Sequence, residues 1–247
     1  MKILVCISHV PDTTTKVRFV DNDSRLDTGG IQWIINPWDE LALTRALELK
    51  DQGLVNAVDV VNVGNAQTEA TLRKALATGA DQAWRLDAEP QDTFQTASVL
   101  AAWLKEQAYD IVLTGISSSD YNGGAMGVML AELTGLNSIA SVTSLSIQDG
   151  KITLSRDMEG GQEVLETMAP VVVIVQKGIA LEPRIPSMRG IMQARQKPLQ
   201  VVGVNLPQAR LAHDRFRLPQ AKGGCRMIDP ENLQELVRLL KEESRVL

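Results

Sequence analysis

The chain has 247 residues, of which 44% are hydrophobic and 22% are charged, as in an ordinary folded globular protein. This length allows one large α/β domain, or one domain with an appendage. The formal net charge of −5 disfavours nucleic-acid binding, which needs a basic surface. The two cysteines lie far apart in sequence and the two histidines are isolated, so neither a disulfide framework nor a metal site is expected.

The N-terminal residues run directly into an apolar segment, without the longer apolar region and small-residue cleavage site of a signal peptide. No uninterrupted apolar run reaches the length of a membrane span. A cytoplasmic location is therefore expected.

Apolar runs alternate with helical patterns through the first half of the chain. A strand is expected at 3–7, followed by a polar, turn-rich excursion at 11–30 that suits a small hairpin. Helices are expected at 39–51, 68–77, 96–107 and 124–133, and strands at 57–63, 83–86 and 111–113. This β-α-β-α order predicts a doubly wound, mostly parallel sheet of the Rossmann-like kind, in which ligands bind beyond the carboxyl ends of the strands.

The pattern changes after residue 140. Alternating segments at 141–148 and 151–156 flank Asp149-Gly150, which is a turn signal for a β-hairpin, and a third strand is expected near 162–166. The apolar run at 170–176 suits a buried strand. These segments predict a hairpin insertion near 141–166 within an α/β domain that spans residues 1–190.

The last quarter of the chain lacks the regular alternation of apolar runs and helical patterns. Two prolines exclude regular helix from 182–186, a short basic helix is expected at 190–197, and residues 200–224 are expected to be irregular. An amphipathic helix follows at 230–243. Because a long segment without a dense core needs something to pack on, residues 191–247 are predicted to form an arm that embraces a partner subunit. The alternative is a tail folded back on its own domain.

The most informative stretch spans residues 109–133, where a short apolar run gives way to glycines and small polar residues and then to a helical pattern. Gly115, Gly123, Gly124 and Gly127 allow close approach of the backbone, and Ser117–Ser119, Asp120 and Asn122 are candidates to cap the helix. A helix N-terminus beside glycines suits an anion, most often a phosphate. The first hypothesis is a nucleotide held at the strand end, and the alternative is an ordinary polar loop.

Four segments at strand ends or helix starts are expected to converge on one crevice: 6–12, 36–40, 63–66 and 115–127. Asn36 and the backbone beside it could read an adenine edge, although Asn36-Pro37-Trp38-Asp39 also suits a simple helix start. Gly64 after Val63 would let a base or ribose lie close to the backbone.

The sequence contains no recognisable catalytic constellation. A Ser-His-Asp or Cys-His arrangement, a dinucleotide fingerprint and a phosphate-loop lysine are all missing. The chain is therefore expected to bind a nucleotide without being an enzyme, and any redox chemistry would belong to a cofactor.

Several motifs together resemble the β subunit of electron transfer flavoproteins over essentially the full length of the chain. They are Val10-Pro11-Asp12 with Lys16-Val17-Arg18, Asn36-Pro37-Trp38-Asp39-Glu40, the run from Thr71 to Asp81, and Glu182-Pro183-Arg184 followed by Ile191-Met192-Gln193-Ala194-Arg195. Each match alone is weak, whereas their order and spacing together are specific.

The resemblance implies a nucleotide-binding α/β domain of the adenine-nucleotide α-hydrolase-like kind, with AMP bound in a structural role. The implied AMP contacts are Cys6, Asn36, Pro37, Trp38, Asp39, Val63, Gly115, Ser119, Asp120, Asn122, Gly123, Gly124, Ala125 and Met126, with the phosphate on 122–126. It also implies a heterodimer with an α subunit that holds most of an FAD, whose edge lies near Thr13. The pair would accept electrons from dehydrogenases and pass them to a quinone oxidoreductase or another acceptor.

The family's recognition loop maps to residues 182–192. The docking residues implied are Glu182, Pro183, Arg184, Ser187, Met188, Ile191 and Met192. Met188 falls where an aliphatic residue anchors in a dehydrogenase pocket, a use that suits a flexible methionine. The alternative is an ordinary buried methionine.

Some residues depart from the family pattern. Where the loop of AMP-type members has Asn-Gln-Thr-Gly, this chain has Gly124-Ala125-Met126-Gly127, so contacts to a phosphate would fall to the backbone donors that such changes leave in place. Residues 92–96 are similar to a segment of electron-bifurcating relatives, which hold a second FAD in place of AMP. Two further hypotheses are an adenylating enzyme of the ATP-pyrophosphatase kind, suggested by residues 117–120, and a stand-alone nucleotide-binding module of the stress-protein kind.

Overall fold

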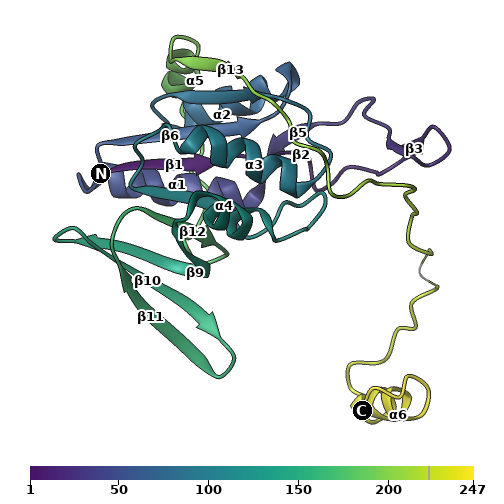
Figure 1. The fold of residues 1–247 in the computed structure, drawn as a ribbon. Coiled ribbons are helices and arrows are strands. Elements are labelled where there is room, and N and C mark those ends of the chain that lie inside the picture. The colour runs from purple at the N-terminus through teal and green to yellow at the C-terminus, as the bar shows by residue number, and fades with distance from the viewer. Residues whose placement is uncertain (222) are drawn as a thin grey trace.

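The computed structural model describes residues 1–221 and 223–247, and a nine-stranded sheet forms its centre (Figure 1). The sheet has the order β11-β10-β9-β12-β8-β1-β6-β7-β13. Its strands are β1 (Lys2–Cys6), β6 (Ala57–Val63), β7 (Ala83–Asp87), β8 (Ile111–Gly115), β9 (Asn137–Gln148), β10 (Lys151–Met158), β11 (Gly161–Thr167), β12 (Val171–Val175) and β13 (Leu199–Gly203). Two antiparallel pairs lie outside it: β2 (His9–Pro11) with β5 (Trp33–Ile35), and β3 (Phe19–Val20) with β4 (Arg25–Leu26).

The order of the strands is that of a doubly wound sheet. β1 pairs in parallel with β6 on one side and with β8 on the other, and the parallel pairing continues to β7 and to β12. The chain builds β6 and β7 on one side of β1, crosses to build β8 to β12 on the other side, and returns with β13 to the edge beside β7, which confirms the predicted fold class. β9, β10 and β11 form an antiparallel extension, with the expected hairpin turn at Asp149 and Gly150, both at positive φ.

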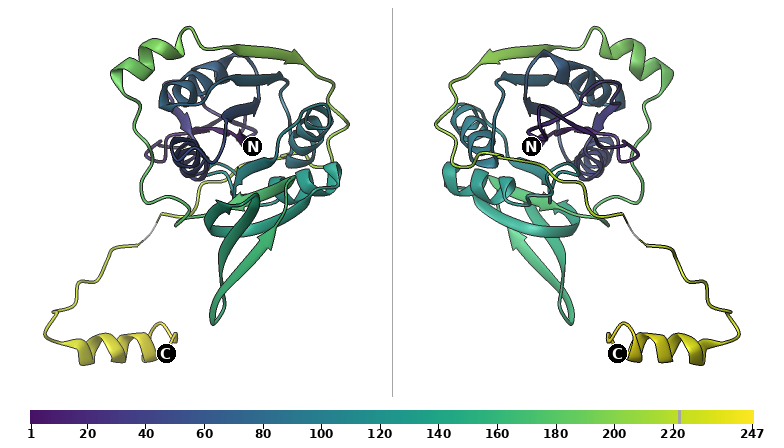
Figure 2. Two further views of the ribbon diagram at one scale, coloured as in Figure 1. Left: turned by 90° about the vertical axis from the view of Figure 1, so that its left-hand side faces the viewer. Right: turned by 90° about the vertical axis from the view of Figure 1, so that its right-hand side faces the viewer.

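Helices cover both faces of the sheet (Figure 2). The covering helices are α1 (Pro37–Asp51), α2 (Glu69–Thr78), α3 (Thr93–Leu104), α4 (Met126–Thr134) and α5 (Met188–Ala194), with a 3-10 turn at Ala66–Thr68; a further helix, α6 (Leu233–Glu242), lies near the C-terminus. Ile3 and Val5 of β1 belong to the core under α1 and α2, whereas Leu4 belongs to the core under α3 and α4. Burying an aliphatic side chain of this size contributes ~1.5–3 kcal/mol, so the two cores hold the carboxyl ends of the strands in register.

One element contradicts the expectation of irregular structure over 200–224. Residues Leu199–Gly203 form β13, which pairs in parallel with β7 from Ala83 to Asp87. The segment is short and partly exposed, as edge strands often are, so its own pattern of hydrophobicity is weak. A backbone partner more than 100 positions earlier in the chain gives it its structure.

The starts of two helices also differ from expectation. The helix predicted at 96–107 begins at Thr93 and ends at Leu104, and Asp92 caps it by accepting a 2.8 Å hydrogen bond from the Gln95 N–H. Helix α4 begins at Met126, and no side chain caps it, so the predicted capping by Ser117–Ser119, Asp120 or Asn122 is wrong. Part of that loop is instead bonded internally, because the Tyr121 N–H donates to the Asp120 carboxylate at 2.7 Å.

The C-terminal helix lies apart from the sheet (Figure 1). Leu233 and Val237 on α6 are 64% and 44% exposed, so an apolar face of this amphipathic helix is uncovered. The division at residues 190 and 191 stays a prediction, although β13 adds later residues to the sheet. Over the residues that the structure describes, no helix combines the length and the apolar character needed to cross a membrane.

Candidate functional site

Asn36 links two of the loops that were expected to converge. Its side-chain amide donates to the Ser117 carbonyl at 2.9 Å, and its carbonyl oxygen accepts from the Ser119 N–H at 3.1 Å. Its own N–H donates to the Ser8 carbonyl at 3.1 Å, just beyond β1. Because both polar groups of this buried side chain are used within the chain, Asn36 positions the loops, and recognition of a base here would fall to the backbone.

Asp39 ties the same loops to the first turn of α1. One carboxylate oxygen accepts from the Ser8 N–H at 2.7 Å and the other from the Gly115 N–H at 3.0 Å. The residue is only 2% exposed. Burial raises the pKa of Asp39 to about 6, although these backbone hydrogen bonds oppose the shift. Burial, with the Asp39 charge nearby, also raises the pKa of Cys6, so the Cys6 thiol is a buried and inert wall of the site.

Two glycines let backbone segments meet at this edge of the sheet. A Cβ on Gly115 would lie 2.7 Å from the Trp38 Cβ, so β8 and α1 can touch only because the side chain is absent. A Cβ on Gly127 would lie 2.6 Å from both Ile174 Cγ1 and Thr114 Oγ1, so the first turn of α4 rests directly on β8 and β12. The predicted close approach of the backbone is therefore present at both positions.

The loop between β8 and α4 is open to solvent. Ser119, Asp120, Asn122, Gly123 and Gly124 are exposed, and Asn122 and Gly124 have left-handed φ values of 52° and 63°. Because no side chain caps α4, the N–H groups of its first turn face this loop without a side-chain acceptor. An exposed loop ending at such a helix start is suited to a phosphate group.

The remaining predicted residues surround this edge. Pro37 occupies the start of α1, Ala125 and Met126 are partly buried at the start of α4, and Val63 ends β6 beside β1. Thr13 is exposed in the loop after β2. The structure thus brings the segments of Cys6, Asn36–Asp39 and 115–126 together, whereas Thr13 sits on the separate excursion before β3.

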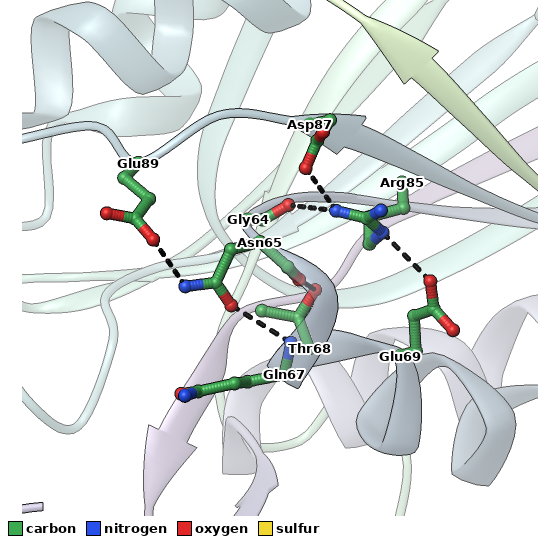
Figure 3. Close-up of polar contacts among 8 residues, drawn as sticks. All are labelled: Gly64, Asn65, Gln67, Thr68, Glu69, Arg85, Asp87 and Glu89. Atoms are coloured by element: carbon green, nitrogen blue, oxygen red, sulfur yellow. Dashed lines mark hydrogen bonds and ion pairs between the residues drawn. The ribbon is translucent and has the colours of Figure 1, made fainter.

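A buried arginine holds the loop after β6, and the sequence pattern did not identify it (Figure 3). Arg85 of β7 is 6% exposed and donates to the Gly64 carbonyl at 3.1 Å, and it forms ion pairs with Glu69 and Asp87. Asn65 in the same loop donates to Glu89 at 2.6 Å. An arginine inside a strand can be identified as buried and bonded only once its neighbours in the folded chain are known.

Replacing Arg85 with methionine is expected to lower the free energy of unfolding by about 2 kcal/mol, because the Gly64 carbonyl and two carboxylates lose their donor. Urea unfolding measures the change. Arg25→Met is the matched control, because the Arg25 side chain is 74% exposed in its ion pair and should contribute less than about 1 kcal/mol. Equal losses in the two variants would contradict the role given to Arg85.

The predicted docking loop is a projecting surface. Ile185, Met188 and Met192 are 87%, 77% and 71% exposed, so Met188 is not an ordinary buried methionine. Ser187 begins α5 by accepting from the Gly190 N–H at 3.0 Å. Arg184 is anchored to Asp51 of α1 at 2.7 Å. The loop therefore exposes apolar side chains to solvent, while the Arg184–Asp51 ion pair holds it to α1.

Helix α5 is tied to α2 by two cations. Arg73 donates to the carbonyls of Ala194 and Lys197 at 2.7 and 2.8 Å, and Lys197 donates to the Ala80 carbonyl at 2.6 Å. A cavity of ≈ 650 Å³ lies between the two helices, beneath the docking loop. These bonds hold α5 and the loop against the sheet domain.

A parallel sheet with an uncapped helix start at its carboxyl edge is typical of α/β proteins that bind nucleotides. The family model described as "Electron transfer flavoprotein domain" matches residues 24–207. The chain is 33% identical to electron transfer flavoprotein subunit beta of Syntrophomonas wolfei, over 94% of this chain and 91% of that protein. It is also 33% identical to the Bacillus subtilis protein of the same name, over 100% of both chains. It is 32% identical to caffeyl-CoA reductase-Etf complex subunit CarD of Acetobacterium woodii, over 98% and 99% of the two chains. The chain belongs to the electron transfer flavoprotein β-subunit family, as its motifs predicted.

Proposed function

We propose that this chain forms a heterodimer with an electron transfer flavoprotein α subunit. The pair takes electrons from dehydrogenases and passes them to a quinone oxidoreductase or another acceptor. FAD, held mainly by the α subunit, supplies the redox chemistry when bound, and this chain completes its surroundings near Thr13. The full-length similarity to β subunits supports the pairing.

The second part of the proposal is that AMP occupies the site at the carboxyl edge of the sheet. The observation that carries it is the meeting of the loops of Ser8, Asn36 and Ser119 beside the uncapped start of α4. The first-turn N–H groups of α4 would hold the phosphate, which needs none of the side chains that differ from the family pattern. The buried Asp39 and Asn36 would keep the loops in place for it.

The nucleotide content of the heterodimer tests this proposal. The chain would be purified with its α subunit, denatured, and the released nucleotides quantified by chromatography. About one FAD and one AMP per heterodimer are expected. A complex without any flavin would contradict the electron-carrier function.

A second candidate is a bifurcating type, with a second FAD in place of AMP. The similarity to a subunit of the caffeyl-CoA reductase-Etf complex favours it, as does the segment at residues 92–96. The same extraction distinguishes the two, because this type would release two FAD and no AMP.

The uncovered face of α6 is expected to bind the α subunit. Replacing Leu233 and Val237 together by aspartate should abolish co-purification of the α subunit, because two charges would enter an apolar contact. Pull-down with a tagged α subunit measures this. Lys241→Asp changes a charge in the last turn of the same helix and should leave the pair intact. Unchanged pull-down by the double variant would exclude this face from the interface.

A further inference from the structure

The chain after β13 crosses the start of α3 before it leaves the sheet domain (Figure 1). Residues 207–216, here called the strap, contact the start of α3, the β3–β4 hairpin and the loop between β8 and α4. The Gln95 side chain donates to the Pro207 carbonyl at 2.7 Å, and the Phe216 N–H donates to the Asp23 carbonyl at 2.8 Å. The strap therefore runs from α3 to the β3–β4 hairpin.

Asp92 fixes the middle of the strap. One of its carboxylate oxygens caps α3 through Gln95, and the other accepts the N–H groups of Arg210 and Leu211 at 2.5 and 2.8 Å. The Arg210 guanidinium also lies over the Phe94 ring, 5.0 Å from its centroid. Both oxygens of Asp92 are thus engaged, one by the helix and one by the strap.

Aromatic stacking joins the strap to the loop between β8 and α4, where a phosphate is predicted to bind. The Tyr121 ring stacks on His213 at 5.0 Å, His213 stacks on Phe216 at 5.4 Å, and Phe216 stacks on Phe19 at 5.1 Å. Tyr121 belongs to the loop between β8 and α4, so this ladder connects that loop to the strap and to the hairpin.

Two helices therefore begin side by side at the site in different states. Helix α4 has no side-chain cap, whereas the start of α3 is closed by Asp92 and covered by the strap. The loop that leads into α4 lies beside the start of α3, because a Cβ on Gly123 would lie 3.7 Å from Thr93 Oγ1. A ligand that extends from α4 toward α3 would have to displace the strap and would meet the Asp92 carboxylate.

We propose that the strap limits the site to a nucleotide with a single phosphate, and that Asp92 is the positioning residue that holds the strap closed. This inference rests on the proposed nucleotide site. A first phosphate fits the open start of α4, while a second one would face a carboxylate and two backbone N–H groups that are already bonded. Opening the strap should therefore relax selectivity between AMP and its diphosphate.

The test uses the heterodimer with an Asp92→Asn variant, stripped of nucleotide and titrated with AMP and with ADP. Asparagine keeps the cap of α3 but presents an amide N–H₂ to the strap N–H groups, so the strap should open without loss of the helix. In the wild-type complex AMP should bind at least about tenfold more tightly than ADP, and in the variant this ratio should fall to about one. Asp214→Asn, the same chemical change at an exposed strap position, should keep the wild-type ratio.

Limited trypsin digestion reports the state of the strap independently, because Arg210 and Arg215 are cleavage sites within it. Faster cleavage there in Asp92→Asn, together with relaxed selectivity, is the expected result. An unchanged AMP-to-ADP ratio despite faster cleavage would overturn the strap's role while leaving the nucleotide site intact. An unchanged cleavage rate would overturn the role of Asp92. A wild-type complex that binds neither nucleotide would overturn the proposed site itself and this inference with it.

Discussion

The free energy of unfolding of the wild-type chain, measured relative to that of an Asp39→Asn variant, is expected to fall by about 3 kcal/mol between about pH 3.5 and pH 7.5. Burial raises the pKa of Asp39 from its ordinary value of 3.8 to about 6 in the folded chain. Between these two values the folded state holds a proton that the unfolded state has lost. The contribution of Asp39 to the free energy of unfolding therefore falls as the pH rises from about 4 to about 6, and it is constant above that.

Asparagine cannot titrate, so the free energy of unfolding of the variant should lack the pH-dependent contribution of Asp39. Urea unfolding of both chains across the pH range measures it, and the comparison cancels the other carboxylates, among them Asp12 and Asp92, whose pKa values are lowered by hydrogen bonds. Asp157→Asn, at an exposed position, is the control and should run parallel to the wild type. If the curves of Asp39→Asn and wild type were also parallel, the carboxylate would not be buried as the structure has it.

Replacing Gly127 with valine is expected to lower the free energy of unfolding by about 3 kcal/mol or more and to weaken AMP binding. The added Cβ would lie 2.6 Å from Ile174 Cγ1 and Thr114 Oγ1, neither of which can move without disturbing the core between β8, β12 and α4. Helix α4 would have to shift outward, and its first-turn N–H groups would shift with it.

Denaturant unfolding and AMP titration measure the two effects together. Gly161→Val is the matched control, because a Cβ there meets nothing within 4 Å and the residue lies in strand β11, where valine is favourable. Its expected change is within about 0.5 kcal/mol. A Gly127→Val chain with wild-type stability would mean that α4 does not rest on the sheet as closely as the structure shows.

Much of the fold was predictable because its signals are local. Strand β6 was predicted at the residues that form it, and Asp149-Gly150 marked the β9–β10 turn, since hydrophobic period and turn chemistry act over a few neighbouring residues. The exposure of Met188 was expected from the family resemblance, and the close backbone approach at Gly115 and Gly127 was expected because glycine has no side chain.

The features that were missed depend on residues distant in the chain. β13 is a strand because β7 offers it a free edge, and Arg85 is buried because Gly64 and Glu69 surround it. Asp92 caps α3 with one oxygen, but its second oxygen accepts hydrogen bonds from the strap, more than 100 residues later.

The sequence alone therefore determined the class of the sheet, the segments that reach the carboxyl edge of the sheet, and the family. Periodicity, turn residues and motif spacing can all be recognised without knowing which distant residues are in contact. Only the tertiary structure decided which of the two neighbouring helix starts is open and which is closed. That outcome depends on where one carboxylate finds its donors, and hydrogen-bond donors that are distant in sequence become neighbours only when the chain is folded.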